Sequence, residues 1–160
     1  IIHMQNLAIT ARAAQLIAHN MHNLTEGCTF FQDHEFLGGL YGTYEGIYDD
    51  VIERMIGLGV SFDINAINRS AMAESLQYDV SEMDSCDMFN LLLTIEANIR
   101  KWAESYDKEA TYGSRNFLQG IADESEKRIG QRTKGIDEGV EDAAEDTSEA
   151  ADTVVNLKTQ

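Results

Sequence analysis

The sequence predicts an all-α protein, a bundle of four helices with a long crossover between the second helix and the third. Three observations indicate this fold. The chain of 160 residues contains no proline, so long helices can run without interruption. Apolar residues recur at helical spacing in four stretches, and a long segment, residues 60–80, separates the second stretch from the third. A chain of this length suits one domain with a sizeable core.

The first two helices are predicted from apolar periodicity. The first runs from about Asn6 to Leu24, and a turn over residues 25–29 leads to the second, from about Phe30 to Leu58. At 100° per residue, the apolar side chains of the second helix fall within an arc of roughly 120°. These side chains are Leu37, Leu40, Tyr41, Tyr44, Ile47, Tyr48, Val51 and Met55. The second helix is therefore expected to be the long helix of the fold.

The remaining elements follow the crossover. Residues 60–80 are expected to contain a short helix between Asp63 and Ser75. The third helix is predicted from about Ser81 to Tyr106 and the fourth from about Ser114 to Lys134. Two long helices, a crossover and two further helices have the connectivity of ferritin-like bundles.

The chain is strongly acidic, with a formal net charge of −16 from 28 acidic and 12 basic residues. Such a surface attracts cations and repels phosphate backbones, although many proteins are acidic simply to stay in solution. The acidic residues are dense toward the C-terminus. We expect the bundle domain to cover residues 1–134 and a solvated acidic tail to cover residues 135–160.

Composition favours a cytoplasmic protein. No apolar run approaches the roughly 18 residues of a membrane span, and residues 1–10 lack the pattern of a secretory signal. Cys28 and Cys86 do not make a disulfide framework in a chain of this size, and they fit a reducing compartment.

A di-iron site inside one bundle is not expected. Such a site usually needs Glu-x-x-His, which places a carboxylate and an imidazole on one helix face. The residues three positions before His19, His22 and His34 are leucine, histidine and phenylalanine. The sequence therefore excludes the common arrangement within one chain.

The second helix offers a different set of ligands. His34, Asp49 and Glu53 lie on one polar face, but His34 and Asp49 are separated by about 22 Å along a helix axis. If two copies of this helix pack antiparallel about a two-fold axis, His34 of one meets Asp49 and Glu53 of the other. Gly38 and Gly42 lie on the same face and indicate a closely approaching partner, unless they reflect a local irregularity of the helix.

His22 completes the candidate site. It lies near the end of the first helix, and the short turn brings it toward His34. Two imidazoles and two carboxylates suit Fe(II), with Zn(II) and other divalent ions as competitors. The alternative is that the histidines are solvated or cap helix ends, and that the carboxylates simply face water.

The run from His22 to Phe30, then His34-Glu35-Phe36 and the segment from Asp49 to Arg54, resembles the mini-ferritins, the family of DNA-binding proteins from starved cells (Dps). The family pattern has a histidine, a short turn with glycine, a phenylalanine, a histidine twelve residues after the first, and then Asp-x-x-x-Glu-Arg. His22, His34, Asp49 and Glu53 match it in identity and spacing.

The resemblance implies a hollow homo-oligomeric shell of twelve subunits with ferroxidase sites at its two-fold interfaces. His22, His34, Asp49 and Glu53 would be the metal ligands and the catalytic residues. One or two iron ions per site would be oxidised, typically by hydrogen peroxide, for storage and detoxification. The sequence departs from the family at Gly38, where members often have an acidic residue, at Asn23, commonly Trp, and at Cys28, usually Pro. The second metal would then depend on other groups, such as Asp33, Glu35 or Glu45.

Two rival interpretations remain open, and direct DNA binding is not expected. Family members that bind DNA tend to carry a Lys-rich terminal arm, whereas the N-terminal residues here include no Lys and the first Arg is Arg12. One rival is a structural or interaction shell that has lost efficient ferroxidase chemistry. The other is a monomeric or dimeric helical metal-binding protein without a storage role.

Overall fold

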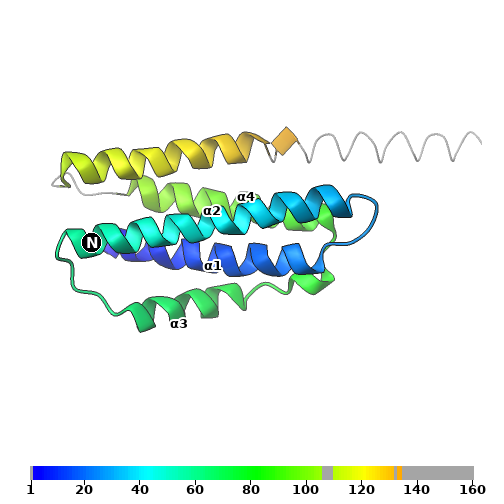
Figure 1. The fold of residues 1–160 in the computed structure, drawn as a ribbon, viewed down its shortest axis with the longest axis horizontal. Coiled ribbons are helices and arrows are strands. Elements are labelled where there is room, and N and C mark those ends of the chain that lie inside the picture. Colours follow the sequence, from blue (N-terminus) through cyan, green and yellow to red (C-terminus); the bar gives the residue numbers. More distant parts are fainter. Residues whose placement is uncertain (1, 106–109, 132, 135–160) are drawn as a thin grey trace, which may run out of the picture.

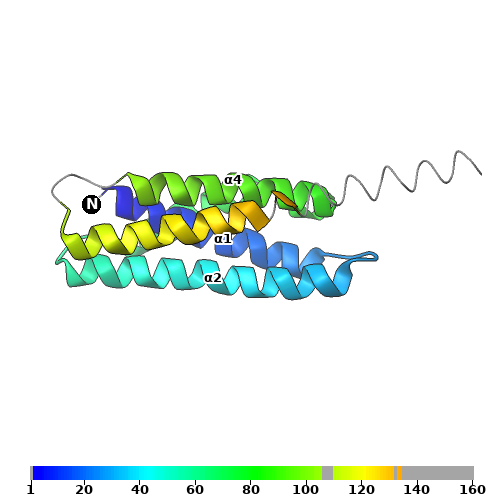
Figure 2. The same cartoon turned by 90° about the horizontal axis from the view of Figure 1, so that it is seen from above.

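The computed structural model describes residues 2–105, 110–131, 133 and 134, and within them all regular secondary structure is helical. The long helices are α1 (Ile2–Leu24), α2 (Phe30–Gly57), α4 (Ser85–Glu104) and a final helix that begins at residue 112. They run side by side along one axis (Figures 1 and 2). The predicted all-α, ferritin-like bundle is confirmed.

α1 and α2 form an antiparallel hairpin (Figure 1). The turn between them needs Gly27, whose φ of +94° is accessible to glycine but rarely to other residues. The amide of Thr25 donates to the Met21 carbonyl at 2.9 Å, and the amide of Phe30 donates to the Gly27 carbonyl at 3.1 Å. This tight turn places the end of α1 directly beside the start of α2.

The crossover contains the predicted short helix, α3 (Ile64–Ser75), which packs against α1 on the outside of the bundle (Figure 1). The Asp63 carboxylate caps it and accepts from the amides of Asn65 and Ala66 at 2.8 and 3.1 Å. A carboxylate at this position satisfies amides that have no partner within the helix. The expected boundaries between Asp63 and Ser75 therefore match the observed ones.

The third bundle helix begins later than predicted, at Ser85 instead of Ser81. Asp84 caps α4 by accepting from the Asp87 amide at 2.8 Å, while Val80–Glu82 forms a separate 3-10 turn, η1. Asp79 caps that turn, and hydrogen bonds from Ser81 lower the pKa of its carboxyl. Each of these caps follows from a carboxylate placed just before a helical turn.

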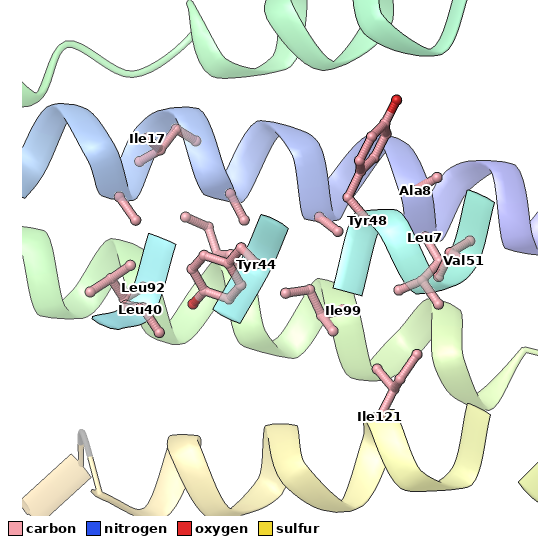
Figure 3. Close-up of a cluster of buried hydrophobic side chains, with 14 of the residues drawn as sticks. Leu7, Ala8, Ile17, Leu40, Tyr44, Tyr48, Val51, Leu92, Ile99 and Ile121 are labelled. Atoms are coloured by element: carbon pink, nitrogen blue, oxygen red, sulfur yellow. The ribbon is translucent and has the colours of Figure 1, made fainter. Parts of the chain in front are cut away.

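The core lies where α1, α2, α4 and the final helix meet (Figure 3). Most of the predicted apolar arc of α2 is buried, while Tyr41 and Ile47 are half-buried. α1 contributes several alanines to the core, which allow neighbouring helices to pack closely. These alanines are Ala8, Ala11, Ala14 and Ala18. α1 also starts earlier than predicted, at Ile2, because Met4 continues its buried stripe.

None of the helices in the described ranges is long and apolar enough to cross a membrane. The predicted acidic tail, residues 135–160, lies outside the described residues.

Candidate metal centre

His22 and His34 hold each other in place through their own backbones. The Nδ1 atom of His22 lies 2.8 Å from the carbonyl oxygen of His34, and the Nδ1 atom of His34 lies 2.9 Å from that of His22. A carbonyl oxygen can only accept, so each Nδ1 carries a proton and donates it. In the neutral ring, Nε2 then carries the lone pair that can bind a metal. Both imidazoles are thus fixed in the tautomer that presents Nε2.

The helix hairpin explains why this pairing is possible. The carbonyl of His22 is one of the last four of α1, which have no partner within the helix. The two rings stack with their centroids 3.7 Å apart, and Phe30 stacks on the His34 ring at 4.9 Å. A Cβ atom at Gly38 would lie 3.3 Å from both Cε1 and Nδ1 of His22. Glycine at position 38 therefore leaves room for the His22 ring.

Asp49 and Glu53 lie farther along α2, and both are exposed. Across the part of the chain that the structure describes, no three His, Cys, Asp or Glu side chains gather closely enough to hold a metal ion. One chain therefore brings His22 and His34 together but leaves both carboxylates apart from them. This agrees with the separation expected from fifteen residues of helix, about 22 Å.

A different polar cluster occupies the interior of the bundle, and the sequence patterns did not indicate it. Glu96 of α4 is completely buried. It accepts hydrogen bonds from the Tyr44 hydroxyl at 2.8 Å, the Ser125 hydroxyl at 2.7 Å and the Arg128 guanidinium at 2.7 Å. Because Arg128 compensates the buried carboxylate, Glu96 does not need a cation from outside. Its trace in the sequence is an acidic residue within the apolar stripe of α4, which does not by itself identify the partners of that residue.

Glycines mark the exposed face of α2 that leads from His34 to Glu53. Gly38, Gly42 and Gly46 are spaced by four residues, so the row extends one turn beyond the predicted pair of Gly38 and Gly42. A Cβ atom at Gly42 or Gly46 would meet no described atom within 4 Å. Each glycine inside a helix costs about 1 kcal/mol relative to alanine. Contacts among the described residues therefore give no reason for glycine at these two positions.

An exposed aromatic side chain and an open pocket lie toward opposite ends of the same helix. Phe31, in the first turn of α2, is 84% exposed. The pocket has a volume of about 470 Å³ and lies between the end of α2 and the final helix. Its lining residues are Asp50, Glu53, Arg54, Gly57, Leu58 and Phe117. The Arg54 guanidinium lies 4.8 Å from the centre of the Phe117 ring and forms one wall.

Comparison with known proteins identifies the family. The ferritin-like domain family matches residues 7–139, most of the chain. The protein therefore belongs to the ferritin-like family, in agreement with the helix order and the bundle. No curated protein sequence matches the chain.

Proposed function

We propose that this protein is a Dps-type mini-ferritin, a hollow shell of identical subunits that oxidises Fe(II) at sites shared between two chains and stores the ferric product. The observation that carries the proposal is the paired orientation of His22 and His34. Metal-binding histidines almost always donate their second ring N–H to a carboxylate, a carbonyl or water, which fixes the tautomer. Here both imidazoles donate this N–H to a backbone carbonyl oxygen.

The carboxylates come from a second copy of α2. In an antiparallel pair with its two-fold axis at Gly42, a residue before Gly42 faces the residue equally far after it. Gly38 then faces Gly46, and His34 faces the segment that holds Asp49 and Glu53. The three glycines are symmetric about this axis, and the open space at Gly42 and Gly46 allows the two helices to approach closely. The pairing creates two equivalent sites, each built by both chains.

The exposed phenylalanine supports the same register. Phe31 lies eleven residues before Gly42 and so faces Glu53, at the rim of the pocket beside Arg54. Insertion of Phe31 into the pocket of the second copy would remove its ring from water. Complete burial of such a side chain is worth roughly 1.5–3 kcal/mol. The glycines and the pocket therefore point to one arrangement.

The resulting site suits Fe(II) oxidation. The carboxylates neutralise the charge of the bound ions, and the imidazole Nε2 atoms bind them while leaving positions open for the oxidant. Two Fe(II) ions lose one electron each, and one hydrogen peroxide molecule takes both and becomes two hydroxide ions. No side chain has to supply or remove a proton. The net charge of −16 favours the arrival of cations at the shell.

Twelve subunits are the proposed assembly, and direct DNA binding is not part of the proposal.

A second candidate function is a shell that binds metal but oxidises it poorly. Gly38 favours this candidate, because the His22 ring takes the space where many family members have a carboxylate. The two candidates differ in turnover and agree in assembly.

The test is a rapid-mixing experiment on the purified shell. Fe(II) is added anaerobically, then hydrogen peroxide, and ferric absorbance is followed for wild type and His34→Ala. We expect the initial rate to fall at least tenfold in the variant, with light scattering showing a shell in both. Equal rates would exclude catalysis at this site. A wild-type particle no larger than two subunits would exclude the shell.

A further inference from the structure

A third imidazole lies beside the proposed site. His19 is one turn before His22 on α1, and its side chain is exposed. Its ring stacks on that of Tyr41, with centroids 4.2 Å apart and planes 19° from parallel. Tyr41 in turn meets His22 edge-on at 5.4 Å. Tyr41 of α2 therefore holds His19 and His22 on the same side of the hairpin.

We propose that His19 binds a second metal ion in the inter-subunit site, in place of a carboxylate at position 38. The inference rests on the proposed function, because His22 is taken as a ligand of the first ion. The centroids of the His19 and His22 rings are 6.2 Å apart. His22 stacks directly on His34, with centroids 3.7 Å apart, whereas the His19 ring lies one helical turn farther along the hairpin. His19 is therefore placed beside the first ion, where a second ion at the usual spacing of two-metal sites, roughly 3.5–4 Å, would lie.

The second copy offers a carboxylate at the matching level. α1 is antiparallel to α2, so it runs parallel to the α2 of a copy that pairs antiparallel. One turn separates His19 from His22, and one turn in the same direction separates Glu45 from Asp49. If His22 meets Asp49 of the second copy, His19 meets its Glu45, which is exposed and available. Each of the two ions would then be within reach of an imidazole from one copy and a carboxylate from the other.

The experiment is an anaerobic Co(II) titration of the assembled protein, followed by calorimetry and visible absorption. The test variant is His19→Phe, which keeps a ring to stack on Tyr41 but removes the ligand nitrogens. The matched control is His3→Phe, because His3 also stacks on an aromatic ring, that of Trp102 at 6.0 Å, far from the site along α1. Circular dichroism and light scattering check that both variants fold and assemble.

We expect two Co(II) ions per site in wild type and His3→Phe, and one in His19→Phe. Two ions in His19→Phe, or one in wild type, would overturn the role of His19. Failure of the proposed function gives a different result, because wild type would then bind no Co(II) that depends on His22 and His34.

Discussion

The Nδ1 atom of His22 lies 2.8 Å from the carbonyl oxygen of His34, and the reverse distance, from Nδ1 of His34 to the carbonyl of His22, is 2.9 Å. This reciprocal pair fixes two rings on two helices with one set of contacts. It leaves the lone pairs of both Nε2 atoms outside these contacts, and it requires the short turn at Gly27 to bring α1 and α2 into register. The hairpin therefore holds both imidazoles in the tautomer that the proposed metal site requires.

The row of Gly38, Gly42 and Gly46 predicts that the α2 helices of two subunits pack closely. Gly42→Leu should leave the subunit folded, because a Cβ atom there meets no described neighbour within 4 Å. It should prevent the two α2 helices from approaching and so release smaller species in light scattering. Gly120→Leu is the matched control, since Gly120 is also exposed on a helix with open space around it. An intact Gly42→Leu shell would remove the argument for a two-fold axis at this residue.

Phe31 is expected to stabilise that pair. Phe31→Ser removes a ring that is 84% exposed in the single chain, so the fold should not be destabilised. Dissociation of the pair on dilution should become at least tenfold easier, as loss of roughly 1.5–3 kcal/mol of burial implies. Tyr112→Ser, at a residue 91% exposed, should leave assembly unchanged. Sedimentation velocity across a dilution series distinguishes the two variants, and equal behaviour would contradict the insertion of Phe31 into the pocket.

The buried Glu96–Arg128 pair is expected to stabilise the fold without taking part in iron chemistry. Arg128→Met leaves the Glu96 carboxylate without its cation and should lower the free energy of unfolding by about 3–5 kcal/mol. The double variant Glu96→Gln, Arg128→Met removes the charge as well and should recover part of that loss. Urea unfolding measures the free energy of unfolding of the double variant and of each single variant, Arg128→Met and Glu96→Gln. Near-additive effects of the two single changes would show that the pair is not coupled.

Helix positions could be predicted from the sequence because each helix buries a periodic stripe. The apolar arc from Leu37 to Met55 predicted the buried side of α2, and Asp63 predicted the start of α3. α4 begins four residues later than the apolar pattern predicts. The acidic caps at Asp79 and Asp84 divide a segment whose apolar pattern looks continuous. Local pattern thus fixes which side of a helix is buried better than where the helix begins.

The site could be predicted only where chain neighbours build it. His22 and His34 come together through a five-residue turn, which the sequence displays. The Tyr44–Glu96–Arg128 cluster depends on how helices distant in the sequence pack together, and the spacing of these residues along the chain does not predict their contact. The stacking of His19 on Tyr41 likewise depends on the rotation of α1 against α2. The joining of Asp49 and Glu53 to the histidines requires a second chain and stays a prediction.

The most direct measurement of that shared site is a complementation assay. One variant carries His22→Ala and His34→Ala, and the other carries Asp49→Ala and Glu53→Ala. Each alone should be inactive in the Fe(II)–peroxide assay. Shells from co-expression should recover about a quarter of the wild-type rate, because half of the two-fold pairs are mixed and each of these has one intact site of two. Mixed shells that assemble but stay as inactive as the parents would contradict a site built by two chains.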